Sequence, residues 1–381
     1  MNLFDLYKAV KTGYAPDLRT MGFARILRNA AVAAVKTLSG ALPLSFAANG
    51  QPLLDYTIHG NTVQDGTPAP DEPVEVVGCG DRTENLFDKN APDRTTTGYI
   101  KSDGTIQSST NFSTSGYISI NGLTTVTLSG YGGGNEPAYC LYDSNREFIS
   151  GTAYTGRATI TLTVGAAAFI RMAYRNEAAD TAMLNAGETA MPYEPHGYRV
   201  PISVQSEDGA ESVTAVYLDK PLHKIGDYSD SVDYEEGVAK RYVKELVLTG
   251  KENFISDGEN TNTIRFYTTE IINYLSGLSF CTHFINRKQA EITNGDTEGF
   301  ALYNGKQVGF RVSKKIGTTT AAWKAYLAEQ YAAGTPVKVY YVLKVPETEQ
   351  VTLPTIPTFD GTNTLDAITA VKPSSMEIKY R

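Results

Sequence analysis

Short apolar runs separated by turn-forming residues dominate the chain between residues 85 and 197. The run Thr159–Val164, TITLTV, alternates strictly between polar and apolar positions, which is typical of a half-buried strand. Regularly spaced short strands with such turns predict a β-sandwich or jelly roll over residues 85–197. The predicted strands are Gly116–Ile120, Thr125–Ser129, Ala138–Tyr142, Ala158–Val164 and Ala168–Tyr174.

A second β-rich region extends from residue 198 to residue 345 and contains one helix. The helix is predicted at residues 319–333, where Thr319 can cap the first turn and Gly334 the last. An apolar stripe at helical spacing should face the second β domain; it consists of Trp323, Tyr326, Leu327 and Tyr331. Strands are predicted at Arg199–Val204, Val213–Tyr217, Ala239–Leu248, Thr263–Tyr267, Phe280–Phe284, Gly299–Tyr303, Gln307–Val312 and Val337–Val345.

The first 50 residues predict a helical segment for docking or assembly. Apolar residues recur every three or four positions in residues 2–12 and 19–38, which indicates two amphipathic helices. Docking is favoured over an ordinary helix folded back onto its own sheet, because few β-rich residues lie nearby to cover it. The side chains expected to make the docking contacts are Leu3, Leu6, Phe23, Ile26, Leu27 and Val35.

Residues 51–84 predict an extended linker with short strands at residues 52–59 and 74–77. The prolines at positions 68, 70 and 73 fix φ and remove amide donors, so this stretch should be stiff. Residues 346–381 are rich in Thr and Pro and predict an extended tail with short β runs. The expected fold is therefore mainly β, with N-terminal helices followed by two β-sandwich, jelly-roll-like domains, the second of which carries one α-helix.

The net charge and the cysteine content of the chain argue against several kinds of partner and site. The 381-residue chain has a net charge of −8, which gives no electrostatic reason to bind nucleic acid or an anionic membrane. Cys79, Cys140 and Cys281 lie far apart and form no CxxC pair, which favours buried thiols over disulfides or a zinc site. No secretory signal or uninterrupted apolar span is evident, so we expect the chain to stay in the cell that makes it until lysis.

Catalytic and cofactor-binding motifs are not evident in the sequence. The acidic ladder Asp227, Asp230 and Asp233 leaves calcium open as a less favoured interpretation, because the spacing and central glycine of an EF-hand are missing. No P-loop or GxSxG motif occurs, and we expect no catalytic residue, metal or cofactor. The histidines are isolated from one another and are interpreted as structural or surface residues: His59, His196, His223 and His283.

Several stretches together resemble a known family. They are residues 60–88, which read GNTVQDGTPAPDEPVEVVGCGDRTENLFD, Phe169–Gly197 with its YEPHG ending, Leu222–Gly250, and LAEQYAAGTPVKVYYVL at residues 327–343. In this order they resemble tail and baseplate structural proteins of bacteriophages that infect Gram-positive gut bacteria (Firmicutes), including a sandwich like a carbohydrate-binding module. The resemblance implies a virion protein that is a homotrimer, contacts other tail or baseplate proteins and engages a host-surface glycan.

Tyrosines and arginines of the first sandwich are the natural glycan-binding candidates under this resemblance. Sugar C–H faces stack on aromatic rings, and sugar hydroxyls need fixed polar partners. The competing interpretation, slightly favoured, is that most of these tyrosines line the sandwich core or a subunit interface. The candidates are Tyr131, Tyr139, Tyr142, Tyr154, Arg146 and Arg157.

Two other functions stay open at the level of sequence. A glycan-degrading tail depolymerase would need two carboxyl groups about 5–10 Å apart in an open cleft, and spacing along the chain does not reveal such a pair. A bacterial cell-surface adhesin is the other alternative, which the lack of an evident signal peptide disfavours.

Overall fold

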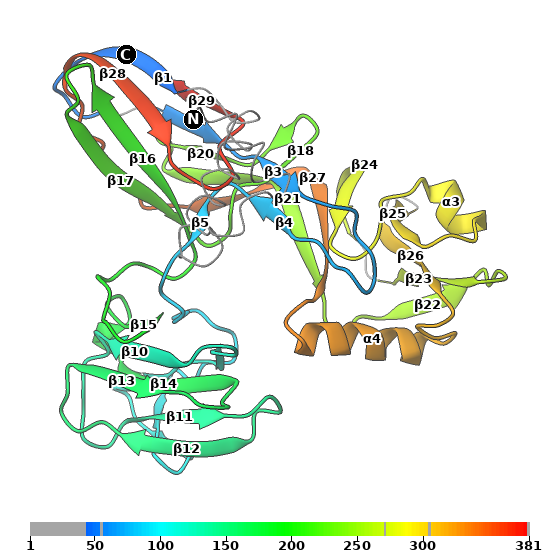
Figure 1. Cartoon of the computed structure of the whole chain (residues 1–381), viewed down its shortest axis with the longest axis horizontal. Coiled ribbons are helices and arrows are strands. Elements are labelled where there is room, and N and C mark those ends of the chain that lie inside the picture. The colour runs from blue at the N-terminus through cyan, green and yellow to red at the C-terminus, as the bar shows by residue number, and fades with distance from the viewer. Residues whose placement is uncertain (1–42, 54–55, 270–271, 304–305, 379–381) are drawn as a thin grey trace, which may run out of the picture. The chain divides into compact units, whose positions relative to one another are not determined.

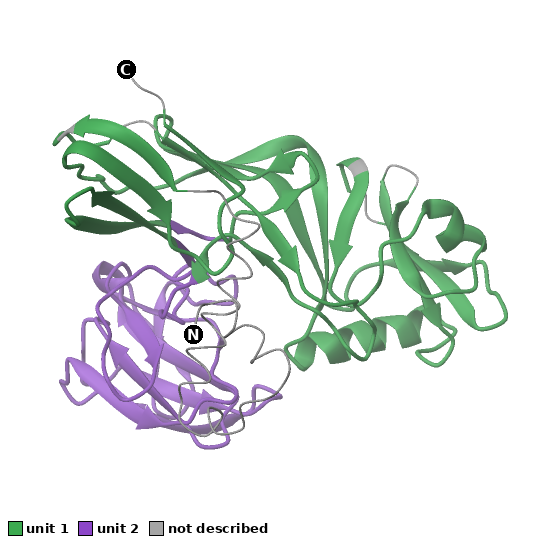
Figure 2. Ribbon diagram, turned by 45° about the horizontal axis from the view of Figure 1, so that its top comes forward, with its two compact units in different colours: residues 1–81, 200–216, 221–381 green, residues 82–199, 217–220 purple. Residues whose placement is uncertain are grey.

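The computed structural model describes residues 43–53, 56–269, 272–303 and 306–378, and these residues form a mainly β protein with antiparallel sheets (Figure 1). They divide into two compact units (Figure 2). Unit 2 comprises residues 82–199 and 217–220, and unit 1 comprises the other described residues. The predicted sandwich at residues 85–197 lies within unit 2.

Unit 2 is built from two antiparallel sheets that share one core. The three-stranded sheet has the order β13-β10-β15, and the other has the order β12-β11-β14-β8, with β9 also paired to β14. Apolar side chains of both sheets, such as Leu128 and Ile170, belong to one buried cluster. The strands are β8 (Phe112–Thr114), β9 (Ile118–Ser119), β10 (Thr125–Ser129), β11 (Ala138–Tyr142), β12 (Phe148–Ala153), β13 (Thr159–Thr163), β14 (Phe169–Arg175) and β15 (Met183–Ala186), with the hairpin β6 (Gly98–Ile100) and β7 (Ile106–Ser108) and the short 3-10 helix η2 (Asn176–Ala178).

The alternating run at residues 159–164 contains a half-buried strand, as predicted. In β13 the threonines are exposed, while Ile160 and Leu162 are buried in the core of unit 2. Period-two alternation places successive side chains on opposite faces of a strand, so one face meets the core and the other meets water. The half-buried strand predicted there is confirmed.

Unit 1 contains three larger sheets. Their orders are β1-β28-β16-β17 with β5 paired to β16, then β24-β27-β21-β20-β2-β29, and β22-β23-β26-β25. Two short hairpins, β3-β4 and β18-β19, accompany them. The strands are β1 (Leu44–Asn49), β2 (Tyr56–His59), β3 (Thr62–Gln64), β4 (Val76–Gly78), β5 (Asp81–Arg82), β16 (Tyr198–Ser206), β17 (Glu211–Leu218), β18 (Lys224–Ile225), β19 (Tyr228–Ser229), β20 (Ser231–Asp233), β21 (Val238–Leu248), β22 (Phe254–Asp257), β23 (Thr263–Thr268), β24 (Tyr274–Cys281), β25 (Gly299–Tyr303), β26 (Gln307–Ser313), β27 (Val337–Gln350), β28 (Asp360–Ala367) and β29 (Ser375–Ile378).

Helix α4 (Thr320–Ala332) packs against strands of both the second and the third sheet of unit 1, and the shorter α3 (Gln289–Asn294) lies beside β25 (Figure 1). The hydroxyl of Thr319 accepts a hydrogen bond from the amide of Ala322, as the predicted N-cap requires. Trp323 and Leu327 are fully buried, but Tyr331 is 48% exposed. At about 100° per residue, Tyr331 is turned roughly 80° from Trp323, so it lies outside the buried stripe to which we assign it from the sequence.

The predicted linker and tail are parts of the unit 1 sheets. Strand β2, inside the predicted linker of residues 51–84, pairs with both β20 and β29. Strand β28, inside the predicted tail of residues 346–381, pairs with both β1 and β16. The division into 51–84, 198–345 and 346–381 therefore does not match the compact units, because these pairings join segments far apart in sequence.

The predicted N-terminal helices at residues 2–12 and 19–38 lie outside the described residues, and so do all six proposed docking side chains. At the end of the predicted helical segment of residues 1–50, Leu44–Asn49 form strand β1. Pairing with β28 accounts for this difference, since the partner strand lies more than 300 residues away in the sequence.

Candidate functional site

An open hollow of about 620 Å³ in unit 2 is the candidate site. Three loops form it: the glycine-rich loop that follows β10, the loop that precedes β13, and the turn that follows β14. They bring together residues that are up to 51 positions apart in sequence. The residues that line the hollow are Gly130, Tyr131, Gly132, Gly133, Gly134, Gly156, Arg157, Ala158, Glu177, Ala178 and Thr181.

Glycine is required where the first loop approaches its neighbours. Gly130 and Gly132 have φ values of 66° and 85°, in the left-handed region that favours glycine. A Cβ atom at Gly130 would lie 1.9 Å from the carbonyl oxygen of Thr181, and one at Gly132 would lie 2.7 Å from Cδ of Arg175. Because glycine has no Cβ atom, the loop can lie close to Arg175 and to the turn that follows β14.

Tyr131 anchors the glycine-rich loop in the core of unit 2. Its side chain is only 1% exposed, and its ring centroid lies 4.4 Å from that of Tyr154. Its hydroxyl donates a hydrogen bond to the backbone carbonyl of Arg157. Burial raises the pKa of this hydroxyl, so it remains a donor at neutral pH. Tyr131 therefore ties two of the three loops of the hollow together.

Of the two charged residues that line the hollow, Glu177 has a partner of opposite charge among the described residues and Arg157 does not. Glu177 lies 3.7 Å from a guanidinium nitrogen of Arg175, whose Nε also donates to the carbonyl of Gly132 at 3.1 Å. By contrast, the exposed guanidinium of Arg157 makes no hydrogen bond or ion pair with any residue that the structure describes. The hollow therefore presents one uncompensated cation and one acid that already has a partner.

The structure brings only two of the six predicted glycan-binding residues, Tyr131 and Arg157, to the hollow. Tyr142 and Tyr154 are 4% and 1% exposed, so their rings cannot serve as stacking platforms. The Tyr154 hydroxyl donates to the carbonyl of Ala173 at 2.8 Å. Tyr139 is half-buried, 6.4 Å from the Tyr154 ring. The interpretation of most of these tyrosines as core residues is supported, because Tyr131, Tyr142 and Tyr154 are buried in the core cluster of unit 2.

Arg146 lies in a different cluster of unit 2. Its guanidinium carbon is 4.8 Å from the ring centroid of Tyr117 and 5.4 Å from that of Phe169. It also lies 3.9 Å from a carboxylate oxygen of Asp93. Arg146 therefore has cation–π and ionic partners of its own and does not line the hollow.

The sequence interpretation missed the residues that shape the hollow. The glycine run at 130–134 lacks phosphate-binding spacing and by itself predicts only a flexible loop, and no sequence pattern pointed to Arg175, Glu177 or Thr181. The single available signal was a glycine run followed, about 25 residues later, by Gly156-Arg157 between two strands. That signal is weak, because the convergence of these loops depends on sheet pairing rather than on spacing.

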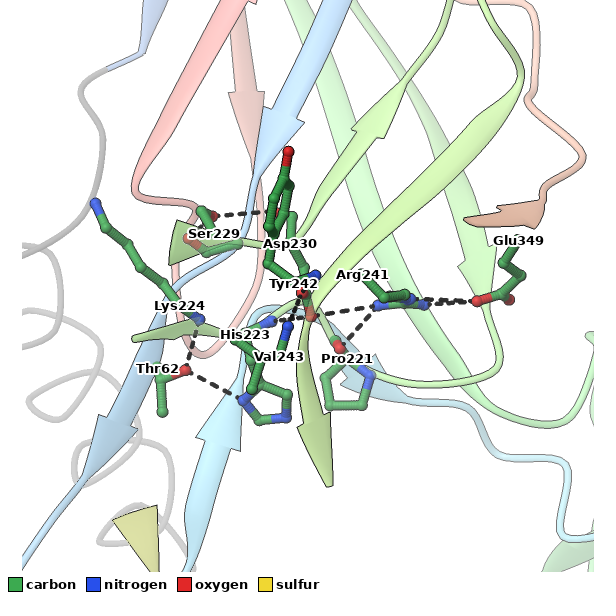
Figure 3. A network of polar contacts seen from close by, with 11 residues as sticks. Thr62, Pro221, His223, Lys224, Ser229, Asp230, Arg241, Tyr242, Val243 and Glu349 are labelled. Carbon is green, nitrogen blue, oxygen red and sulfur yellow. Dashed lines mark hydrogen bonds and ion pairs between the residues drawn. The ribbon is translucent and has the colours of Figure 1, made fainter. Parts of the chain in front are cut away.

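A second polar cluster lies in the interior of unit 1 (Figure 3). The carboxylate of Asp230, 1% exposed, accepts hydrogen bonds from the backbone amides of His223, Tyr242 and Val243 at 2.7–3.0 Å. Arg241 lies 3.9 Å from this carboxylate and also pairs with Glu349 at 3.1 Å. Burial raises the pKa of Asp230, while the amide donors and Arg241 oppose that shift.

His223 completes this interior cluster. Its Nδ1 is 3.1 Å from the hydroxyl oxygen of Thr62, and that oxygen also accepts the amide of Lys224 at 2.8 Å (Figure 3). Burial lowers the pKa of His223 to about 4, so the ring is neutral at physiological pH. The cluster joins β3 to the segment before β18 and to β21, and its contacts give it a structural role.

The acidic ladder does not converge on one point. Asp230 is buried and bonded to backbone amides, Asp227 is exposed, and Asp233 accepts the amide of Glu236 at 3.1 Å. Within the described ranges, no three His, Cys, Asp or Glu side chains are grouped as metal ligands. The calcium interpretation of this ladder therefore gains no support. The three cysteines are buried thiols, as predicted, and burial raises their pKa.

No family model, curated protein or solved structure gives a significant match to this chain. Among the described helices, none combines the length and the apolar character needed to cross a membrane. The site must therefore be interpreted from its own geometry and from the family resemblance of the sequence.

Proposed function

We propose that this chain is a structural protein of a bacteriophage tail, in the baseplate, tail tip or fibre, and that unit 2 is its sandwich for host-surface glycans. The observation that carries the proposal is the open hollow on a compact β unit, formed by loops that lie outside both sheets. Binding sites occur preferentially on loops that a rigid scaffold positions. The stretches that resemble tail and baseplate proteins occur in both units.

The proposed role is non-enzymatic. A depolymerase needs two carboxyl groups that face a substrate across a cleft. The interior acid of unit 1, Asp230, is sealed from water and accepts three backbone amides, which leaves it unsuited to reach a substrate. At the hollow of unit 2 the lining carboxylate is Glu177, and Arg175 already compensates it.

The proposed assembly is a homotrimer that contacts neighbouring tail proteins through the first 40 residues. The trimer rests on the family resemblance, in which sister copies cover exposed sheet edges. Light scattering of the purified chain tests it, since a trimer has three times the mass of one chain. A monomeric mass across the accessible concentration range would contradict this part of the proposal.

Deletion of residues 1–40 tests the docking role. We expect the shortened chain to stay folded and soluble, because both described units lie after residue 40. It should not be incorporated into particles when it replaces the full chain during phage production. Circular dichroism checks the fold, and immunoblotting of purified particles checks incorporation. Normal incorporation of the shortened chain would remove the docking role.

A further inference from the structure

We infer that the unit 2 hollow binds an anionic sugar unit, meaning a saccharide that carries a carboxylate or a phosphate, through the guanidinium of Arg157. The inference rests on the proposed glycan-binding role of unit 2 and names the ligand class for it. Three features of the hollow support this class: the lack of an accessible aromatic ring, the charge balance, and the free amides of the glycine-rich loop.

The hollow offers no aromatic platform among its described lining residues. Its one aromatic lining residue is Tyr131, whose side chain is 1% exposed and packs against Tyr154. Neutral sugars gain much of their affinity from stacking a C–H face on an accessible ring. A ligand of this hollow must instead be held by polar and charged contacts.

The charge balance of the hollow favours an anion. Arg157 has no ionic or hydrogen-bonded partner in the described part of the chain, whereas Glu177 lies 3.7 Å from Arg175. A guanidinium presents a planar fork of donors that matches the two oxygens of a carboxylate or phosphate. An anionic ligand would give Arg157 the partner that the chain itself does not provide.

The glycine-rich loop adds backbone donors to this cation. No hydrogen bond within the described residues uses the amides of Gly132, Gly133 or Gly134. Gly132 and Gly133 have positive φ values of 85° and 67°. Successive amides in loops of this kind can form a concave site for anions. The residues that carry these amides line the same hollow as Arg157.

Internal hydrogen bonds hold the loops of the hollow together. The Tyr131 hydroxyl bonds to the carbonyl of Arg157, and the Thr181 hydroxyl donates to the carbonyl of Gly130 at 2.9 Å. Arg175 donates to the carbonyl of Gly132. A site whose loops are already tied together loses less conformational entropy when a ligand binds.

Titration of the full-length protein with four probes tests the inference. The probes are glucuronic acid, glucose 6-phosphate, glucose and inorganic phosphate, with binding followed by saturation-transfer NMR and calorimetry. At least one acidic sugar should bind about tenfold more tightly than glucose, as expected for a charge-assisted contact. The stronger of the two acidic sugars identifies the anionic group. Added salt should weaken the binding, because the site is open to solvent.

Two matched variants locate the binding. Arg157→Gln should lower the affinity for the acidic sugar about tenfold, whereas Arg146→Gln, which changes an exposed arginine outside the hollow, should leave it unchanged. Equal affinity for glucose and both acidic sugars, or an unchanged affinity in Arg157→Gln, would overturn the inference. Inorganic phosphate that binds as tightly as both acidic sugars would indicate an adventitious ion only and would also overturn it.

This test is separate from that of the proposed tail role. Arg157→Gln should be incorporated into particles as well as the unchanged chain, because residue 157 lies outside the first 40 residues. Loss of acidic-sugar binding with normal incorporation would locate the ligand contact in unit 2. Failure to bind any probe, with normal incorporation, would reject the anionic ligand and leave the tail role standing.

Discussion

The hydroxyl of Tyr131 donates a hydrogen bond to the backbone carbonyl of Arg157. A residue of the unit 2 core thereby fixes the loop that presents the guanidinium to the hollow. The ring of Tyr154 lies beside it at a centroid distance of 4.4 Å, and the Tyr154 hydroxyl makes an equivalent bond to the carbonyl of Ala173, which does not line the hollow. This pair of tyrosines allows stability and ligand binding to be separated experimentally.

Tyr131→Phe should weaken both folding and binding. The loss of one hydrogen bond should lower the free energy of unfolding by about 0.5–1.5 kcal/mol. It should also reduce affinity for the acidic sugar, because the loop of Arg157 loses its attachment to the core. Thermal unfolding and calorimetric titration measure the two effects.

Tyr154→Phe is the control for that variant. It removes the same kind of hydrogen bond from the same aromatic pair, so unfolding should change by a comparable amount. Affinity for the acidic sugar should stay the same. If Tyr131→Phe and Tyr154→Phe alter binding equally, the tie between Tyr131 and Arg157 has no role in presenting the guanidinium.

Trp323→Ala should strongly destabilise unit 1. The indole is fully buried, stacks on Phe266 at a centroid distance of 5.7 Å and contacts Tyr326 at 5.5 Å. Truncation of a large buried aromatic residue costs about 3–5 kcal/mol because it leaves a cavity. Chemical denaturation followed by circular dichroism should show a lower midpoint for unit 1.

Two comparisons make the Trp323 result specific. Tyr331→Ala, on the same helix but 48% exposed, should change stability by less than about 0.5 kcal/mol. In the unchanged protein, the fluorescence of this single tryptophan should be blue-shifted and resistant to iodide. Red-shifted, readily quenched emission together with a silent Trp323→Ala variant would show that α4 is not packed on the sheet.

Local sequence patterns predicted several strands of this fold, whereas some strands held by long-range pairing were not predicted. Strands β10, β11 and β25 have the bounds predicted from local pattern alone. Strand β28 was missed because its residues, DGTNTLDA, carry turn-forming signals, and it is held by β1 and β16 on either side. Tertiary pairing thus overrode local preference.

The sequence also predicted the candidate site only in part. Aromatic clustering in the sequence pointed to Tyr131, Tyr142 and Tyr154, but these rings are buried in the core of unit 2. Arg157, also a predicted glycan-binding residue, lines the hollow, and its binding role stays a prediction. Its lack of a partner among the described residues depends on the pairing of Glu177 with Arg175, which no sequence pattern predicts.

Asp230→Asn should destabilise unit 1 without affecting any glycan chemistry. An amide has one acceptor oxygen where the carboxylate has two, so buried backbone donors lose partners at a cost of about 1–3 kcal/mol or more. Glu235→Gln, at an exposed turn, is the control and should be nearly neutral. Urea denaturation measures both. Release of reducing ends from cell-wall polysaccharide that disappears in either variant would favour a depolymerase.

His223 should make unit 1 less stable at acidic pH. Its folded-state pKa of about 4 lies below the ordinary value of 6.5, so between these values the unfolded chain binds a proton that the folded chain does not. Stability therefore falls as pH decreases through this window, by up to about 1.4 kcal/mol per pH unit for one site. Urea denaturation at several pH values between 4 and 8 measures the slope.

His223→Gln isolates this contribution. Burial also lowers the pKa of His283, which adds a slope of the same sign in both proteins. The raised pKa of Asp230 acts in the opposite direction and starts from its ordinary value of 3.8. The unchanged protein should thus lose more stability than the variant between pH 6.5 and pH 4. Equal slopes would show that His223 is protonated normally in the folded state.

Location of the chain in phage particles tests the central claim most directly. Antibodies raised against the purified chain, used with gold labels on purified particles in electron microscopy, should mark the tail or its distal end. The label should disappear from particles produced without the chain. If the purified particles carry no label while the chain is found on the bacterial surface or only in the cell fraction, the protein is not a tail component.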